Sequence, residues 1–186
     1  MFKSLFGKSN PTRTWRPYSG QPLAFDLDAG SLNDGELGQP LECMSFLGPD
    51  EDRKSFRNGE FCYYSLGLCV QCHGAEYAIA GYHIVFRDPE EQKYQPFTGR
   101  VIRNGHTIDL AAITPDKCAD VFGEYFWLDR DEDESIVFYE FTGREWQLEF
   151  DDTPSLKRVI VTNRPLMADE AQRKAYNVTK PWPPSA

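Results

Sequence analysis

Apolar and polar residues alternate most regularly between positions 144 and 150 of the 186-residue chain. Side chains two positions apart in a strand lie on the same face, so Trp146, Leu148 and Phe150 are expected in a core. The polar residues between them then face solvent or a partner. Strand-like runs at 135–141 and 156–162 flank this segment, with turn residues in between. The pattern therefore predicts two hairpins of one antiparallel sheet.

Aromatic residues are also expected on the outer face of this sheet. If Tyr63 and Tyr139 point into the core, their neighbours Tyr64 and Phe138 point outward. Exposed aromatic side chains on a sheet face indicate either a partner site or a second packed layer. The sequence leaves both interpretations open.

Helical spacing occurs in two short apolar stretches. Cys118, Val121 and Phe122 lie at i, i+3 and i+4, and the same spacing recurs from Cys43 to Leu47. A glycine follows each stretch at a position that suits a helix end. Both cysteines are therefore interpreted as small core residues rather than as ligands or nucleophiles.

The chain also resembles itself at an offset of 75 to 76 residues. Ten identities fall in the aligned stretches, where random pairing at about 6% per position would give roughly three. They predict an α+β protein of two homologous halves, each a short helix packed on an antiparallel sheet. The expected divisions are a flexible N-terminal segment (1–22), a first repeat (23–87), a connector (88–99), a second repeat (100–162) and a C-terminal helix with a Pro-rich tail (163–186).

The residues Cys69, Cys72 and His73 form C-x-x-C-H, the motif by which c-type cytochromes attach haem. Attachment requires both cysteines on one side, which a helical turn provides. The repeat alignment instead places the motif in a strand, with Cys72 at the core position of Leu148 and with Cys69 and His73 facing outward. A zinc site that adds Cys62 lacks the paired C-x2-C knuckles of structural zinc sites. A structural strand is the favoured interpretation, and no cofactor is expected.

Composition narrows the class of partner. Twenty basic and 29 acidic residues give a net charge of −9, which argues against nucleic acid and favours a basic protein partner. An odd number of cysteines, five, indicates a reducing compartment. No apolar run approaches the 18 residues of a membrane span, and the start lacks the apolar core of a signal peptide. We therefore expect a cytoplasmic protein without stable membrane insertion.

The segment from Glu124 to Glu134 combines aromatic and acidic residues as binding loops do. Aromatic side chains supply buried anchors at interfaces, and acids steer a basic partner. The alternative is that the aromatics cap the core and the acids form a solvated turn. The candidate partner-binding residues on this segment and on the outer sheet face are Tyr125, Phe126, Trp127, Asp129, Asp131, Glu132, Asp133, Glu134, Tyr64, Phe138, Glu145 and Gln147.

Two tandem units of a short helix and an antiparallel sheet, with the helix-ending Gly48 and Gly123, resemble the fold of the β-lactamase inhibitor proteins and the small outer-membrane assembly lipoproteins. The resemblance covers about residues 23 to 162. It implies one continuous curved sheet whose outer face and adjoining loops bind another protein. The chain shows no export signal, no lipid-attachment cysteine near its start and no evident disulfide pairs, so the envelope function of those proteins is not implied.

These patterns together predict a non-enzymatic protein-binding module, in its most concrete form an acidic inhibitor or immunity-type protein that occludes a basic partner. No recognised catalytic motif occurs in the sequence. The alternative is a redox, metal or haem protein centred on Cys69, Cys72 and His73.

Overall fold

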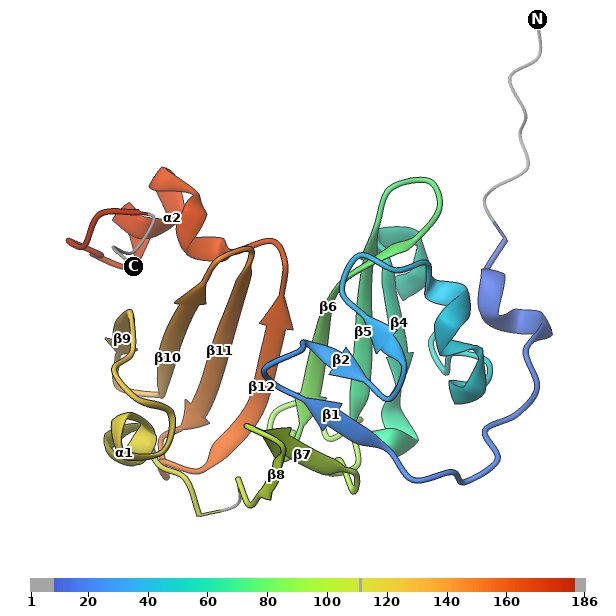
Figure 1. The fold of residues 1–186 in the computed structure, drawn as a ribbon, viewed down its shortest axis with the longest axis horizontal. Helices are drawn as coiled ribbons and strands as arrows, with labels where there is room; N and C mark the ends of the chain where they lie inside the picture. The colour runs from blue at the N-terminus through green and yellow to red at the C-terminus, as the bar shows by residue number, and fades with distance from the viewer. Residues whose placement is uncertain (1–8, 111, 183–186) are drawn as a thin grey trace, which may run out of the picture.

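The computed structural model describes residues 9–110 and 112–182. It is an α+β structure with two sheets and short helices, as the sequence predicts at this level (Figure 1). In the part of the chain that is described, no helix is both long and apolar enough to cross a membrane.

The larger sheet has seven strands, and every neighbouring pair in it is antiparallel. Pairing between β6 and β12 joins the strands of residues 60–85 to those of residues 127–162, so one continuous sheet runs through both parts (Figure 1). In spatial order the strands are β4 (Glu60–Tyr63), β5 (Leu68–His73), β6 (Ala78–Val85), β12 (Leu156–Thr162), β11 (Arg144–Asp151), β10 (Glu134–Phe141) and β9 (Trp127–Arg130).

The smaller sheet lies in front of the larger one in Figure 1 and has five short strands. Its central pair, β1 and β7, is parallel, with Phe25 opposite Val101. The predicted hairpin turn at Asn104-Gly105 joins β7 to β8, and both residues have the positive φ that a tight hairpin turn requires (49° and 74°). In spatial order the strands are β3 (Gly35–Glu36), β2 (Ser31–Leu32), β1 (Ala24–Asp26), β7 (Arg100–Arg103) and β8 (His106–Ile108).

Both predicted helical stretches are helical but very short. The first is a 3₁₀ helix, η2 (Leu41–Leu47), and the second consists of η5 (Pro115–Lys117) followed by α1 (Cys118–Phe122). Cys118 is fully buried, as predicted, whereas Cys43 is only half-buried at the edge of the core. The remaining helices are η1 (Pro11–Thr14), η3 (Ser55–Asn58), η4 (Tyr64–Leu66), η6 (Leu166–Ala168) and α2 (Glu170–Ala175).

Part of the N-terminal segment that was predicted to be flexible packs against the first half. Thr12 in η1 is fully buried, and its hydroxyl oxygen accepts a hydrogen bond of 2.9 Å from the backbone N–H of Asp50. Residues 1–8 lie outside the described residues. The chain is therefore attached to the body of the protein at Thr12.

The main core lies on one face of the seven-stranded sheet and is closed by the five-stranded sheet and the short helices. Trp146, Leu148 and Phe150 are at most 1% exposed within it, so the alternation along β11 predicted this face correctly. The ring of Tyr82 in β6 meets Phe25 of β1 edge to face, with centroids 5.4 Å apart. Contacts of this kind connect the two sheets.

A second apolar cluster covers the opposite face at the β9–β10 end of the sheet. Its buried members are Phe126, Ile136, Phe138 and Met167. Residues from the C-terminal segment, including Tyr176 and Trp182, pack against it, and α2 lies at this end of the sheet (Figure 1). The Phe138 and Tyr176 rings meet edge to face at 5.4 Å. Of the two interpretations of the outward aromatics, a second packed layer holds at Phe138.

Candidate functional site

The predicted aromatic anchors are largely used inside the protein. Phe126 is only 7% exposed and Trp127 is half-buried against the same outer cluster, because residues 127–130 form β9 rather than a loop. Tyr125 is half-buried, with its ring 6.5 Å from that of Tyr139. Phe126 and Phe138 are therefore not free to anchor a partner, which corrects the expectation for these two residues. Tyr125 keeps an accessible side.

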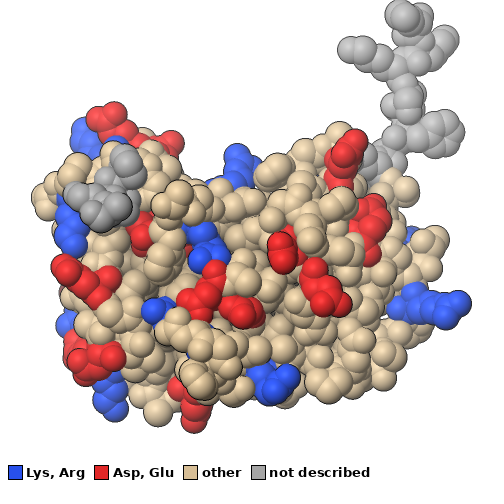
Figure 2. Space-filling model, in the orientation of Figure 1, with Lys and Arg blue, Asp and Glu red and all other residues tan. Residues whose placement is uncertain are grey.

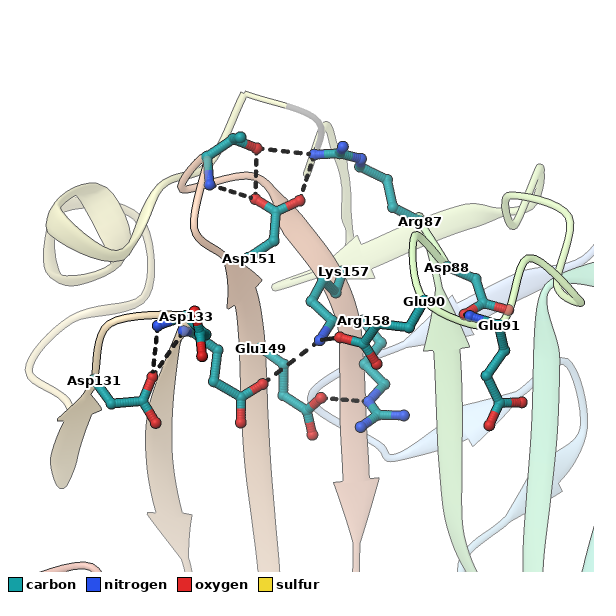
Figure 3. Close-up of polar contacts among 12 residues, drawn as sticks. Arg87, Asp88, Glu90, Glu91, Asp131, Asp133, Glu149, Asp151, Lys157 and Arg158 are labelled. Carbon is teal, nitrogen blue, oxygen red and sulfur yellow. Dashed lines mark hydrogen bonds and ion pairs between the residues drawn. The ribbon is translucent and has the colours of Figure 1, made fainter.

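The acids that follow β9 form the turn of the β9–β10 hairpin. One carboxylate oxygen of Asp131 accepts hydrogen bonds from the backbone N–H groups of Asp133 (3.0 Å) and Glu134 (2.8 Å), and these bonds lower the pKa of Asp131 (Figure 3). Asp129 is half-buried, and burial raises its pKa. Glu132 and Asp133 are exposed. Asp131 therefore stabilises the turn, in agreement with the alternative interpretation that the acids form a solvated turn.

Two adjacent cations lie on the outer face because β12 has a bulge opposite Glu149. Lys157 Nζ lies 2.6 Å from a carboxylate oxygen of Glu90 and 3.5 Å from one of Glu134, while Arg158 pairs with Glu149 (Figure 3). Without the bulge, consecutive strand residues would face opposite ways. On the face shown in Figure 2, acidic and basic side chains are likewise interspersed. The net charge of −9 is thus not gathered into one acidic patch on that face.

Glu145 and Gln147, predicted to face a partner, are part of the packing of the C-terminal segment. Glu145 is fully buried, and its carboxylate accepts hydrogen bonds from the Gln147 side-chain amide and from the backbone N–H of Met167 at 3.0 Å. The expectation that Glu145 is available to a partner is therefore wrong. The reason is that the chain after β12 turns back over this face.

Tyr64 lies far from the other predicted partner-binding residues. Its hydroxyl donates a 2.7 Å hydrogen bond to Asp52, and its ring contacts that of Tyr94 with centroids 4.8 Å apart. It follows β4, one edge strand of the seven-stranded sheet, whereas Tyr125 precedes β9, the other edge strand. The structure therefore does not combine them into one site.

The C-x-x-C-H residues are separated as strand geometry predicts. Cys72 belongs to the main core, while Cys69 lies on the opposite face beside Cys62, with the two Sγ atoms 3.9 Å apart. His73 is exposed at the end of β5. Among the described residues, no group of three or more His, Cys, Asp or Glu side chains is arranged to hold a metal ion.

A pocket of about 440 Å³ opens where β9 stops covering β10. β9 pairs with β10 only over Ser135–Phe138, and one further bond runs from the Phe126 N–H to the Phe138 carbonyl (2.8 Å). The rest of β10, residues 139–141, has no strand on that side in the described part of the chain. The pocket is lined by Phe122, Glu124, Tyr125, Phe126, Tyr139, Glu140, Phe141, Lys180 and Pro181.

Glu140 is the most unusual group in this pocket. Both of its carboxyl oxygens are buried, and neither accepts a hydrogen bond from a donor among the described residues. Burial first, and then the negative charge of the neighbouring Glu145, raise the pKa of Glu140 to about 10. Glu140 is therefore protonated near neutral pH, and a neutral carboxyl group can donate a hydrogen bond.

Sequence reasoning missed Glu140, although a signal for it exists. Glu140 and Glu145 stand opposite each other in the β10–β11 hairpin, equally spaced about the Thr142-Gly143 turn. A pair of acids opposite each other beside an apolar strand indicates a perturbed carboxyl group. Lys180, whose ammonium lies 5.8 Å from the centre of the Phe126 ring, could not be found in this way because it is distant in sequence.

Comparisons with known proteins yielded a distant structural likeness. No protein-family model matches the chain, and no curated protein sequence matches it. Among solved structures, the chain is similar to a DUF4309 family protein (YjgB) from Bacillus subtilis, with 13% sequence identity and a TM-score of 0.44 over 65% of this chain and 75% of that one.

Proposed function

We propose that this protein is a non-enzymatic binding module that takes an extended segment of a protein partner along the uncovered end of β10. The observation that carries the proposal is the coincidence of an unpaired strand edge with the pocket around Glu140. An apolar side chain of the bound segment occupies the pocket.

The backbone of β10 supports this mode of binding. The Phe138 carbonyl points toward β9, where it accepts the Phe126 N–H. Backbone groups two residues apart point to the same side of a strand, so the N–H and carbonyl of Glu140 point to the same edge beyond the end of β9. An extended peptide can add to such an edge through main-chain hydrogen bonds.

The side chains around the edge provide selectivity. Five of the nine residues that line the pocket are aromatic, and the others include Glu124 and Lys180, which suits an aromatic anchor that also carries a polar group. Glu140 lines the pocket and is protonated, so it adds no negative charge there. Lys180 Nζ lies 3.5 Å from the Tyr125 carbonyl at the rim. The net charge of −9 still favours a basic partner through long-range steering.

Selection of peptides from a random display library with the whole protein would test the proposal. We expect the Tyr125→Ala variant to bind the selected peptides about tenfold more weakly than the wild type does. This loss corresponds to about 1.4 kcal/mol of binding free energy from one anchoring side chain. Tyr94→Ala is the matched control, because Tyr94 is also half-buried and also packs on a tyrosine ring. Recovery of no peptide, or equal losses in both variants, would contradict the proposal.

We also propose that the two halves are homologous. In support, the 75- to 76-residue offset superposes η2 on η5–α1, β4 on part of β10, β5 on β11 and β6 on β12. The Phe25–Val101 register of β1 and β7 has the same offset. Related sequences in which the two halves align no better than shuffled ones would argue against duplication.

A cytoplasmic location remains part of this proposal. The five cysteines are all free thiols, which suits a reducing compartment. Fractionation of the native cells with an antibody would test it, and recovery of the protein only outside the cytoplasm would overturn it.

A further inference from the structure

Cys62 and Cys69 face each other across two neighbouring antiparallel strands, β4 and β5. The Cys62 carbonyl accepts a hydrogen bond from the Glu51 N–H (2.8 Å), and on the other side of β5 the Val85 N–H bonds to the Gly67 carbonyl (2.8 Å). Both bonds mean that the backbone groups of Cys62 and Cys69 point away from each other. They therefore form a non-hydrogen-bonded pair, the kind in which opposite Cα atoms are only about 4.5 Å apart.

That separation falls within the range that a disulfide can bridge. The two Sγ atoms are already 3.9 Å apart, so bond formation needs a rotation of side chains rather than a movement of the backbone. Cys72 is separated from both by the sheet itself, because it packs in the main core. Cys62 and Cys69 are thus the pair of thiols that the fold places close enough to form a disulfide.

Both thiols line a groove of about 300 Å³ on the outer face of the sheet. Tyr94 and the cations Lys157 and Arg158 line the same groove, as does His83, which stands opposite Cys69 in the register of β5 and β6. His83 is neutral, because burial and then the charge of Arg158 lower its pKa to about 3. Cys62 and Cys69 are only 6% and 5% exposed, and this groove is where they meet the surface, so a small molecule is the favoured reactant.

The surroundings distinguish the two thiols. The Cys62 thiol lies 3.6 Å from the Ser55 hydroxyl. The hydrogen-bonding contact with Cys69, and then that with Tyr94, lower the pKa of Cys62 to about 6, although burial opposes this. The same interaction with Cys62, followed by burial, raises the pKa of Cys69. Cys62 is thus the thiol that is more readily ionised, and the thiolate is the reactive form.

We propose that Cys62 and Cys69 form a redox site that reacts with small disulfides such as oxidised glutathione and closes reversibly to an intramolecular disulfide. Cys62 is the attacking thiol and Cys69 the resolving thiol. The proposal is independent of peptide binding at β10, because the two sites lie at opposite ends of the seven-stranded sheet.

The reaction proceeds by two exchanges. The Cys62 thiolate attacks one sulfur of the small disulfide, forming a mixed disulfide and releasing one small thiolate, which takes up a proton. Cys69 then loses its proton and attacks Cys62 Sγ, forming the Cys62–Cys69 bond and releasing the second small thiol. Two protein thiols are oxidised and one small disulfide is reduced to two thiols.

Thiol mapping of the folded whole protein after treatment with oxidised glutathione tests the proposal. Cleavage after Arg57 and Arg87 yields one peptide, residues 58–87, that carries Cys62, Cys69 and Cys72. Alkylation under denaturing conditions is expected to modify a single cysteine of this peptide after oxidation and all three after added reductant. Cys43 and Cys118 are expected to remain alkylated throughout.

Three variants assign the roles. In Cys69→Ala the reaction should stop at a glutathione adduct on Cys62, and in Cys62→Ala no adduct should form on Cys69 above background. Cys72→Ala is the matched control, and it should still form the Cys62–Cys69 bond. Circular dichroism and the unfolding midpoint of each variant show whether it is folded.

Several outcomes would overturn the proposal. These are a wild-type protein that keeps all three thiols free in oxidised glutathione, a disulfide that contains Cys72, and a stable adduct on Cys69 instead of Cys62. Wild-type protein alone decides the first two, so an unfolded variant does not leave the proposal untested.

Discussion

Replacing Glu140 with glutamine removes a carboxyl group that the fold keeps protonated. Its pKa is raised from 4.5 to about 10, so the folded state binds this proton more tightly than the unfolded state does. The contribution of Glu140 to the free energy of unfolding is fully present below pH 4.5, the pKa of the unfolded state. This contribution is lost as the pH rises from 4.5 toward 10. Glutamine has nearly the same shape and no charge, so the variant should lack this loss.

The size of the effect follows from the shift. Each pH unit above 4.5 lowers the free energy of unfolding by up to about 1.4 kcal/mol, because the folded state must keep a proton that the unfolded state has lost. At pH 7 this loss amounts to up to about 3 kcal/mol. Glu140 is only partly buried and its pocket is open, so screening by water reduces this to about 1–2 kcal/mol. Glu140→Gln should therefore be more stable than the wild type by about 1–2 kcal/mol at pH 7, by little at about pH 5 and by more at about pH 9.

Urea unfolding at these three pH values measures the difference. Glu132→Gln is the matched control, because Glu132 is exposed in the β9–β10 turn, and its effect on stability should be small at each pH. A stability difference for Glu140→Gln that does not grow with pH would refute the reasoning, and so would a destabilised variant at pH 9.

Three further predictions test the packing. Met167→Ala should lower the free energy of unfolding by about 2–5 kcal/mol, because Met167 is fully buried in the outer cluster; no loss in urea unfolding would mean that the C-terminal segment does not pack there. In urea unfolding, Gly67→Ala should lower the free energy of unfolding far more than Gly143→Ala does. Both glycines have positive φ, but an added Cβ at Gly67 would lie 2.4 Å from the Phe97 nitrogen while at Gly143 it would meet nothing within 4 Å, so Gly143→Ala should cost only about 1 kcal/mol; equal costs would contradict this. Arg158→Met should cost about 2 kcal/mol at neutral pH, because it leaves the buried Glu149 without its ion pair, and a double variant with Glu149→Gln should recover most of that loss.

The elements with a strong local pattern were predictable from the sequence. The alternation around Trp146 predicts both strand β11 and its buried face. The Asn104-Gly105 pair predicts the hairpin of β7 and β8. The separation of Cys69 from Cys72 follows from the same two-residue period. The α+β class was therefore within reach of reasoning from the residues, whereas a continuous sheet was expected only from the fold resemblance.

Features that depend on distant parts of the chain were not predictable. Met167, Tyr176 and Trp182 are scattered in a segment without periodicity, so nothing in the sequence indicates that they cover Phe138 and Glu145. The parallel pairing of β1 with β7 joins residues 76 apart and has no local signal. Cys62 was considered only as a zinc ligand, because its pairing with Cys69 depends on the register of β4 and β5.

The central claim is that the uncovered end of β10 binds a partner protein, and site-specific photo-crosslinking tests it most directly. A photoreactive phenylalanine derivative placed at Tyr125 in the whole protein, in native lysate, should form a covalent adduct with a defined protein. The same derivative at Tyr18, which is also half-buried but lies beside Gly48 and does not line the pocket, should not. The absence of any adduct at Tyr125, or the same adducts at both positions, would contradict the account.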